Sequence, residues 1–375
     1  MNTSADLIVI GSGIVGLGVA LAARRQGLKV LVLDRSAAQR GASIRNFGFV
    51  TVTGQERGAH WARARRSAEI WSEIAPKAGI SICHRGLLMA CQRPEASAVV
   101  EAFMQTEMGE GCQQLTAAQC HAYNARLRVD GLDSGLYSPH EIRVESREAI
   151  GQLTSYLQSL GVVFRFSEAA VVIDGDTVVT SRQARLTAKQ IVVCPGPDLV
   201  SLYPDRIAAH AVELCTLQMF RVGGLAPGVF QSALMSDLSL VRYAGYAALP
   251  EAQALKNRLA AEQADALAMG IHLIAVQALD GSLVVGDSHV YGDAESVFAE
   301  SRVDTLIFDE LTQLLGAADL SITERWLGTY PSAEGPCFID QPEAHVRLVM
   351  VTGGTGASTA FALGEDVMES LLCSI

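Results

Sequence analysis

The stretch DLIVIGSGIVGLGVALAARRQGLKVLVLD, residues 6–34, decides how this chain begins to fold. Its first five residues form the short apolar run of a strand that is buried on both faces, and a glycine loop follows at once. Apolar residues at helical spacing then lead to Gly27, and KVLVLD at 29–34 predicts a second buried strand. The sequence therefore predicts a βαβ unit and a parallel sheet.

The glycine loop carries a dinucleotide-binding pattern. Gly11, Gly13 and Gly16 form G-x-G-x-x-G between a strand and a helix. Backbone N–H groups and the helix N-terminus at such a loop can hold a pyrophosphate. Asp34 lies about 20 positions further on, where a carboxylate can accept a hydrogen bond from a ribose hydroxyl. This fingerprint fits a nicotinamide cofactor as well as FAD.

Two other segments favour FAD. GASIRNFGFV at 41–50 has small and amide residues that let the backbone approach a flat ring system. GGTGASTAFALGE at 353–365 is a second glycine loop that opens a helix, whose positive dipole end can stabilise the negative charge of a reduced flavin. The residues predicted to bind FAD are Gly11, Gly13, Ile14, Val15, Gly16, Asp34, Arg35, Ser43, Arg45, Asn46, Phe47, Gly48, Cys194, Pro195, Gly196, Gly353, Gly354, Thr355, Gly356, Ala357, Ser358 and Thr359.

Composition excludes several classes of function. The chain has 375 residues, which favours two domains, and its net charge of −11 disfavours nucleic acid as a partner. No apolar run approaches the roughly 18 residues that a membrane span needs. The N-terminus lacks a basic region before its first apolar run, so we expect a cytoplasmic protein. Eight cysteines without zinc-type spacing predict reduced thiols and no metal site.

Strands and helices alternate along the rest of the chain. The sequence predicts helices at 60–78, 251–269 and 296–316, strands at 86–90, 134–144 and 190–196, a helix and a strand within 147–166, a hairpin at 171–180, antiparallel strands within 212–324, and a strand, glycine loop and helix at 347–372.

Several of these motifs together resemble those of the D-amino-acid oxidase superfamily, which includes glycine oxidase and sarcosine oxidase. They are GSGIVG, Asp34, GASIRNFG, VVCPGPD at 192–198 and TGGTGASTAFALGE at 352–365. The runs RGASIRNFGFVTVTGQ, GDSH and ERWLGTYPS are similar to a subgroup of FAD-dependent oxidoreductases associated with phosphonate breakdown.

The resemblance implies an α/β fold with a glutathione-reductase-like Rossmann FAD domain and an inserted antiparallel α+β substrate domain. The expected FAD-binding domain is discontinuous, with segments 1–85, 145–211 and 325–375. Segments 86–144 and 212–324 are expected to form the substrate domain, whose sheet covers the flavin ring. The implied reaction moves hydride from a carbon next to an amine to the flavin, after which the imine hydrolyses and dioxygen accepts the electrons.

One departure from the family pattern bears on the substrate. Glycine-oxidase-like members carry W-x-G-x-R-P, whose arginine holds the substrate carboxylate. Here the run is Trp326-Leu-Gly328-Thr-Tyr330-Pro331, so a tyrosine replaces the arginine. Sarcosine oxidases carry a cysteine in this segment that bonds to the flavin, and this chain has none there, which implies noncovalent FAD.

The residues predicted to bind substrate are Arg45, Arg242, Tyr243, His289 and Tyr330, with Arg325 as a further option. His289 and Tyr330 are also the candidates for catalysis, because a titrating imidazole suits a phosphonate dianion or an amine. His60 is interpreted as a packing residue.

The leading hypothesis is oxidation of a small primary or secondary amine with an anionic tail, such as 2-aminoethylphosphonate or its N-methyl derivative, with dioxygen reduced to hydrogen peroxide. The alternatives are a glycine, sarcosine or D-amino-acid oxidase and an amine dehydrogenase with another electron acceptor. A flavin-binding or tRNA-modifying scaffold is a third class, against which the acidic charge argues. The oligomeric state stays open.

Overall fold

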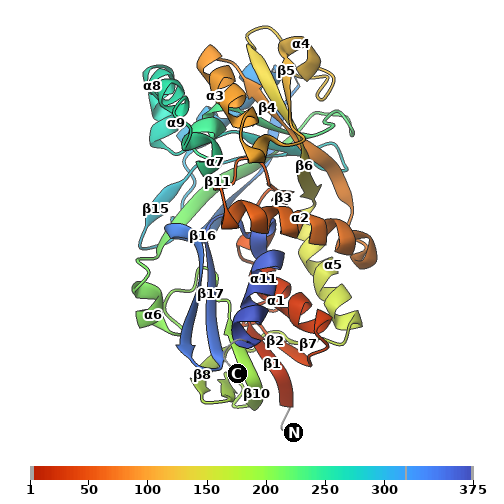
Figure 1. The fold of residues 1–375 in the computed structure, drawn as a ribbon, viewed down its shortest axis with the longest axis vertical. Helices are drawn as coiled ribbons and strands as arrows, with labels where there is room; N and C mark the ends of the chain where they lie inside the picture. Colours follow the sequence, from red (N-terminus) through yellow and green to blue (C-terminus); the bar gives the residue numbers. More distant parts are fainter. Residues whose placement is uncertain (1–3, 317–318, 373–375) are drawn as a thin grey trace.

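The computed structural model describes residues 4–316 and 319–372 (Figure 1). The chain opens with β1 (Ser4–Ile10), α1 (Ile14–Arg25) and β2 (Val30–Leu33). β1 and β2 pair in parallel, and every residue of β2 is buried. The predicted βαβ unit is confirmed.

A parallel sheet, which we call the lower sheet, joins distant parts of the chain. β1 also pairs with β10 (Arg185–Val193), which pairs with β17 (Val346–Gly353), while β2 pairs with β7 (Val163–Arg165). All four pairings, including β1 with β2, are parallel. The N-terminal, middle and C-terminal segments of the chain thus form one parallel sheet. The loops that follow the carboxyl ends of these strands lie close together.

Two helices pack closely beside this sheet. α11 (Gly356–Leu372) lies next to α1, as Figure 1 shows in blue and red. A Cβ atom on Gly18 would lie 2.4 Å from the carbonyl oxygen of Ala360, and one on Gly364 would lie 2.6 Å from the Gly18 backbone. Glycine at both positions therefore lets the two helix backbones approach each other.

The upper sheet is mostly antiparallel. β11 (Glu213–Gly223) pairs with β14 (Leu283–Gly286) and β15 (Val290–Gly292), and β13 (Ile274–Gln277) lies between β14 and β12 (Ala233–Ser236). β12 then pairs in parallel with β4 (Ile82–Cys91), which pairs antiparallel with β6 (Ser134–Val144). The α/β class is confirmed, with a mixed rather than purely antiparallel upper sheet.

A single long strand links the two sheets. β16 (Ser321–Glu343) pairs with β11 along its first half and with β17 along its second half. This strand was not predicted from the sequence, because glycines and prolines interrupt its apolar pattern. The predicted domain boundary between residues 324 and 325 falls inside β16, so the division into domains stays a prediction.

The other elements surround these sheets. They are η1 (Ala42–Ile44), β3 (Phe49–Val50), α2 (Ala59–Ala78), α3 (Pro94–Met104), η2 (Glu107–Gly109), β5 (Gln113–Thr116), α4 (Ala117–Cys120), α5 (Ser146–Ser159), β8 (Ala170–Asp174), β9 (Thr177–Thr180), α6 (Pro204–Ala208), η3 (Asp237–Val241), α7 (Ala244–Ala247), α8 (Ala252–Glu262), α9 (Ala264–Ala268) and α10 (Ser301–Leu315). The helix predicted at 251–269 is split into α8 and α9, and α3 was not predicted.

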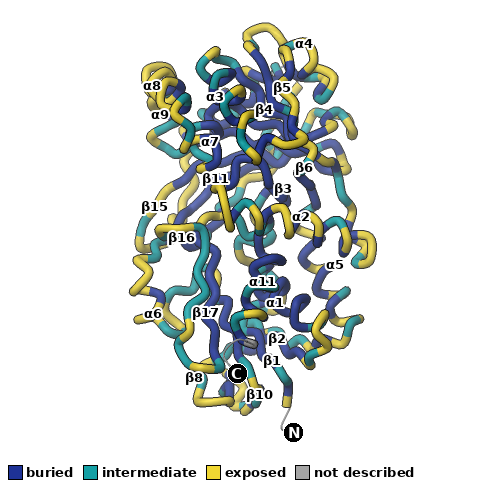
Figure 2. Tube along the Cα trace, in the orientation of Figure 1, coloured by how far each residue is buried: buried dark blue, intermediate teal, exposed yellow. Residues whose placement is uncertain are grey.

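Burial follows the two sheets (Figure 2). In the lower core, the Trp71 ring meets the Phe361 ring edge-on, with centroids 4.9 Å apart. In the upper core, Phe103 packs against Tyr246 with centroids 4.7 Å apart. Within the described ranges, no helix has the length and apolar character needed to span a bilayer.

Candidate functional site

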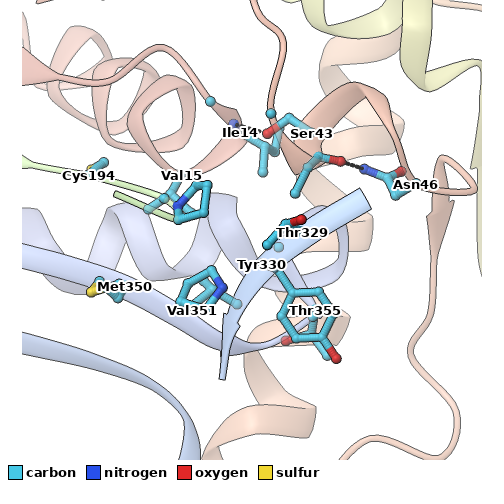
Figure 3. Close-up of a pocket in the computed structure, with 18 of the residues that line it drawn as sticks. Ile14, Val15, Ser43, Asn46, Cys194, Thr329, Tyr330, Met350, Val351 and Thr355 are labelled. Atoms are coloured by element: carbon cyan, nitrogen blue, oxygen red, sulfur yellow. Dashed lines mark hydrogen bonds between the residues drawn. The ribbon is translucent and has the colours of Figure 1, made fainter. Parts of the chain in front are cut away.

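A cavity of about 930 Å³ is lined by residues of both sheets and of the loops between them. Figure 3 shows part of its wall, with Ile14 and Val15 from the N-terminal loop, Ser43 and Asn46 from the following turn, and Met350, Val351 and Thr355 from the C-terminal segment. A cavity of this size suits a ligand as large as a dinucleotide. The loops predicted to bind FAD thus lie around one space.

The first glycine loop presents bare backbone to this cavity. Gly11 has a φ of +105°, and a Cβ atom there would lie 2.3 Å from the carbonyl oxygen of Cys194. A Cβ atom on Gly16 would lie 1.9 Å from the carbonyl oxygen of Gly11. Any larger residue at either position would clash with backbone, so only glycine keeps the N-terminus of α1 open toward a phosphate.

Asp34 lies at the end of β2 and lines the same cavity. Its carboxylate accepts hydrogen bonds from the Ser12 backbone N–H at 2.9 Å, the Ser12 hydroxyl at 2.6 Å and the Ser36 N–H at 2.8 Å. These bonds hold the carboxylate in place beside the glycine loop. Arg35 forms an ion pair with Asp198 at 2.6 Å, which ties the end of β2 to the 192–198 segment.

The 41–50 segment turns sharply at the N-terminus of α1. The Ser43 hydroxyl accepts a hydrogen bond from the Ile14 N–H at 2.9 Å. The Asn46 side chain donates to the Ala42 carbonyl at 2.8 Å and accepts from the Gly48 N–H at 2.6 Å, so it shapes the turn itself. Gly48 faces away from the cavity, because a Cβ atom there would lie 1.8 Å from the Val144 carbonyl oxygen.

The C-terminal glycine loop closes the cavity from the other side. The Thr355 hydroxyl oxygen is buried and has no hydrogen-bond partner among the described residues, as expected for a group that a ligand contacts. Gly354 lies against Tyr330, and a Cβ atom there would lie 3.0 Å from the Tyr330 ring. The Thr359 hydroxyl instead bonds within α11, to the Thr355 carbonyl at 3.0 Å.

The predicted cofactor residues converge on the cavity, except Gly48 and Thr359, which do not line it. All five predicted substrate residues also line it. Arg45 is exposed and donates to the Leu327 carbonyl at 3.3 Å. Arg325 lies outside the lining and forms an ion pair with Asp304. Which of these groups contacts FAD or substrate stays a prediction.

Arg242 is a cationic residue in the upper wall of the cavity. Arg242 follows η3 and donates a hydrogen bond to the Tyr291 hydroxyl at 3.0 Å. Among the described residues, no carboxylate forms an ion pair with this guanidinium. Tyr330 lies on β16 opposite Cys215, and burial raises the pKa of its phenol, so it is neutral. The Tyr330 and His289 rings lie 6.5 Å apart.

Asp287 and His272 were not among the candidates chosen from the sequence. They face each other across the β13–β14 hairpin, with the His272 backbone N–H 3.3 Å from the Asp287 carbonyl. The His272 Nε2 atom lies 3.2 Å from Asp287 Oδ1, without the geometry of a hydrogen bond. Burial raises the pKa of Asp287 to about 7, opposed by Arg242. The GDSH run marked this region, but the pairing of residues 272 and 287 needs the hairpin.

Two imidazoles flank this carboxylate. His289 Nδ1 lies 2.8 Å from the Gly270 carbonyl oxygen, so Nδ1 carries the proton and Nε2 is free to accept one. Burial, with a contribution from Arg242, holds the pKa values of His272 and His289 well below the usual range. The ligand atoms of His272, Asp287 and His289 lie within 4.8 Å of one another, a grouping that was not expected from the sequence, which predicted no metal site.

His60 is buried, as its interpretation as a packing residue requires, and it also borders the cavity. Its Nδ1 atom has no hydrogen-bond partner within the described part of the chain. Burial lowers the pKa of its imidazole to about 4. His60 is therefore a neutral polar group that a ligand could contact.

The glycine loop, Asp34 and the large cavity beside them are typical of a dinucleotide-binding protein, and comparison with known proteins identifies its family. The model of the DAO family, described as FAD dependent oxidoreductase, matches residues 6–370. The chain therefore belongs to the DAO family, it is an FAD-dependent oxidoreductase, and FAD is its cofactor. The cavity, the bare glycine loops and the unpartnered Thr355 hydroxyl fit this cofactor.

Individual relatives are distant in sequence and similar in fold. One of the subunits of an opine oxidase from Rhizobium meliloti is 22% identical over 95% of this chain and 90% of that protein. The structure of L-proline dehydrogenase from P. horikoshii is similar with a TM-score of 0.79 and 17% identity over 98% of this chain and 93% of that one. Glycine oxidase from Geobacillus kaustophilus has a TM-score of 0.78 and 16% identity over 99% and 95% of the two chains.

Proposed function

We propose that this enzyme oxidises a small primary or secondary amine that carries an anionic tail, such as 2-aminoethylphosphonate or its N-methyl derivative. The observation that carries the proposal is the exchange of the carboxylate-binding arginine for Tyr330, while Arg242 lines the same cavity with no carboxylate partner among the described residues. A neutral phenol cannot replace a guanidinium as the partner of a carboxylate. We therefore place the binding site for the anionic tail of the substrate at Arg242 rather than at residue 330.

The wall around Arg242 suits a tetrahedral anion. A guanidinium donates two parallel hydrogen bonds to a phosphonate, and its interaction strengthens where water is excluded. The Tyr291 hydroxyl, which already accepts a bond from Arg242 at 3.0 Å, can donate its own proton to the same anion. These groups supply donors for more oxygens than a carboxylate offers.

The reaction follows from the cofactor of the family. FAD, when bound, accepts a hydride, which is two electrons and one proton, from the carbon next to the amine nitrogen. The resulting iminium takes up water and yields an aldehyde and an ammonium ion, or methylammonium from an N-methyl substrate. The residues of this chain hold the neutral amine in place and keep bulk water away from that carbon.

The test is anaerobic mixing of the purified holoenzyme with a panel of amines, followed by the loss of oxidised-flavin absorbance. We expect 2-aminoethylphosphonate and its N-methyl derivative to reduce the flavin faster than glycine, sarcosine and D-amino acids. Ethylphosphonate, which has the anion but no amine, is the control and should bind without reducing the flavin. Rapid reduction by the amino acids with none by the aminophosphonates would contradict the proposed substrate class.

A dehydrogenase is the second candidate, because a neighbour in fold is named L-proline dehydrogenase and another is named glycine oxidase. We propose dioxygen as the acceptor. Peroxide formed per substrate oxidised in air separates the two: a ratio near one supports the oxidase, and slow reoxidation in air with fast reoxidation by a quinone supports the dehydrogenase.

We further propose that FAD is bound without a covalent link. Gly328 lies in the segment where sarcosine oxidases carry their cysteine, and the Cys337 sulfur lies 3.6 Å from Arg63 further along β16. Denaturation with acid should release all of the flavin into the supernatant. Flavin that stays with the precipitated chain would contradict this proposal.

The cysteines support a reducing compartment, and we propose the cytoplasm. The described cysteines are free thiols, most of them buried, and Cys373 lies outside the described residues. Thiol titration of freshly purified, denatured protein should count every cysteine as reduced.

A further inference from the structure

We propose that Asp287 receives the ammonium group of the substrate and accepts its proton, so that the cavity binds a zwitterion between Asp287 and Arg242. The inference rests on the proposed function and adds to it a site for the nitrogen. It also identifies the group that converts an ammonium ion, which cannot give up a hydride, into an oxidisable amine.

Asp287 is a buried carboxylate that lines the cavity and accepts no side-chain hydrogen bond from the described residues, although His272 Nε2 lies 3.2 Å from its Oδ1 atom. Its residue is only 4% exposed, and its Oδ1 atom makes no hydrogen bond within the described part of the chain. A carboxylate that accepts no side-chain hydrogen bond in such a site carries a large desolvation cost, which a cationic ligand would offset. The position follows β14 directly, so the backbone of the hairpin holds the side chain in place.

The titratable neighbours of Asp287 do not supply the positive charge that a cationic ligand would bring. The charged and titratable groups around it are Arg242, His272, His289, Tyr243 and Cys215. Burial keeps both histidines neutral and raises the pKa values of Tyr243 and Cys215, so none of these four offers a positive charge.

Arg242 does not neutralise Asp287 by direct contact. Its hydrogen bond goes to Tyr291, and no ion pair joins the two residues, although their charges interact through space. One cavity therefore holds a cation and an anion that are each without a direct counter-ion among the described residues. A ligand with an ammonium group at one end and an anion at the other complements both charges at once.

The proton transfer is balanced within this site. The ammonium N–H bond breaks, a bond forms between that proton and an Asp287 carboxylate oxygen, and the products are a neutral amine and a neutral carboxylic acid. A carboxyl group that titrates near neutral pH suits this exchange, and burial raises the pKa of Asp287 to about 7. His289 Nε2 lies 3.9 Å from Asp287 Oδ2, which is beyond hydrogen-bond distance.

The first test measures binding rather than turnover. The probe is 2-amino-2-methylpropanesulfonate, whose nitrogen-bearing carbon has no hydrogen to transfer, and the control ligand is 2-methylpropanesulfonate, which lacks the amine. Calorimetry on the holoenzyme at pH 8 should show that Asp287→Asn weakens binding of the amine at least about tenfold, the effect of losing a charge-assisted hydrogen bond. Binding of the control ligand should not weaken. Asp280→Asn, at an exposed position of the same hairpin, should leave both affinities unchanged.

The second test counts protons. Calorimetry in buffers of different ionisation enthalpy should show release approaching one proton when the aminosulfonate binds well below pH 7, and none well above it, because Asp287 must ionise to receive the ammonium. The Asp287→Asn variant should release none at any pH. The pH dependence of flavin reduction by a true substrate should lose its acid limb in the same variant.

Three outcomes would overturn the inference. If Asp287→Asn weakened binding of the aminosulfonate and of the control ligand equally, the effect would be structural. If it left the affinity for the aminosulfonate unchanged, the ammonium group would bind elsewhere. A stoichiometric divalent metal ion that is present in the wild-type enzyme and lost in Asp287→Asn would assign the His272, Asp287 and His289 cluster to metal binding. If no amine reduces the flavin but the probe still binds through Asp287, the proposed reaction fails while the ammonium site stands.

Discussion

The lower and upper halves of the cavity present different kinds of chemical group to its interior. In the lower half, Gly11, Gly16 and Gly354 present backbone to the cavity, and a Cβ atom at any of them would meet another group at 3.0 Å or less. In the upper half, the half-buried Arg242 and the buried Asp287 present ionisable side chains to the cavity. Backbone donors recognise a phosphate that every FAD carries, whereas side chains can be exchanged one at a time. A cofactor site made of backbone and a substrate site made of side chains can therefore change independently of each other.

The largest effect is expected in the lower half. Gly16→Val should abolish FAD binding, because even a Cβ atom would lie 1.9 Å from the Gly11 carbonyl oxygen. The flavin-to-protein ratio after purification measures this, with circular dichroism to monitor folding. Gly151→Val is the matched control, since a Cβ atom on Gly151 in α5 meets nothing within 4 Å. Full flavin content in Gly16→Val would refute the role of this loop.

Removal of the positive charge of Arg242 should have the next largest effect, on the KM for the substrate. Arg242→Met keeps the apolar length of the side chain and removes the charge, which should raise KM for the anionic amine about 100-fold. An amine with a neutral tail should be much less affected. Arg302→Met, at an exposed ion pair with Asp265, is the control. A similar loss for both kinds of amine would show that Arg242 does not bind the tail.

Replacement of Tyr330, on the strand that joins the two sheets, should change the selectivity between substrates. Tyr330→Arg restores the residue of the glycine-oxidase-like pattern, and we expect kcat/KM for glycine or sarcosine to rise about tenfold, from a new charge-assisted pair with the carboxylate. Steady-state kinetics with both substrate classes measures the shift. Tyr330→Phe, which keeps the ring against Gly354, should not produce it. Unchanged selectivity would indicate that the carboxylate arginine depends on other residues as well.

The smallest effect concerns stability. Asp287 has a pKa of about 7 in the folded protein and an ordinary value of 3.8 when solvated, so the folded state loses stability as pH rises from about 4 to about 7. Ligand-free Asp287→Asn should therefore melt a few degrees higher than wild type at pH 8, with the difference vanishing near pH 4. Differential scanning fluorimetry measures this difference. Asp280→Asn, whose carboxylate has a lowered pKa, should show no such gain, and an equal gain would contradict the assignment.

Sequence reasoning predicted the lower half far better than the upper half. The βαβ unit and the positions of the glycine loops follow from local patterns, since a loop that binds phosphate needs glycines at fixed spacing within a few residues. Gly48 and Thr359 were included because they lie in the same runs, but their contacts are with β6 and within α11. Proximity along the chain could not show which side of the loop each residue faces.

The upper half depends on contacts that no local pattern contains. His272 and Asp287 meet across a hairpin, Arg242 arrives from η3, and Tyr330 arrives from β16. Within GDSH the histidine was the predicted site residue, because a titrating imidazole suits a phosphonate dianion or an amine. The burial of the aspartate cannot be predicted from the local sequence. The long strand β16 was missed because glycines and prolines interrupt its apolar pattern, and its two halves are stabilised by different partner strands.

The sequence by itself determined the nucleotide-binding unit, the choice of FAD over a nicotinamide and the absence of the carboxylate-binding arginine. Each of these features depends on residues that lie close together along the chain. The tertiary structure alone decided that Asp287 is buried, with no hydrogen bond to its Oδ1 atom from the described residues, in the cavity that also holds Arg242. Desolvation and the distance between charges depend on the packing of two sheets, and those quantities govern which ligand the cavity can bind.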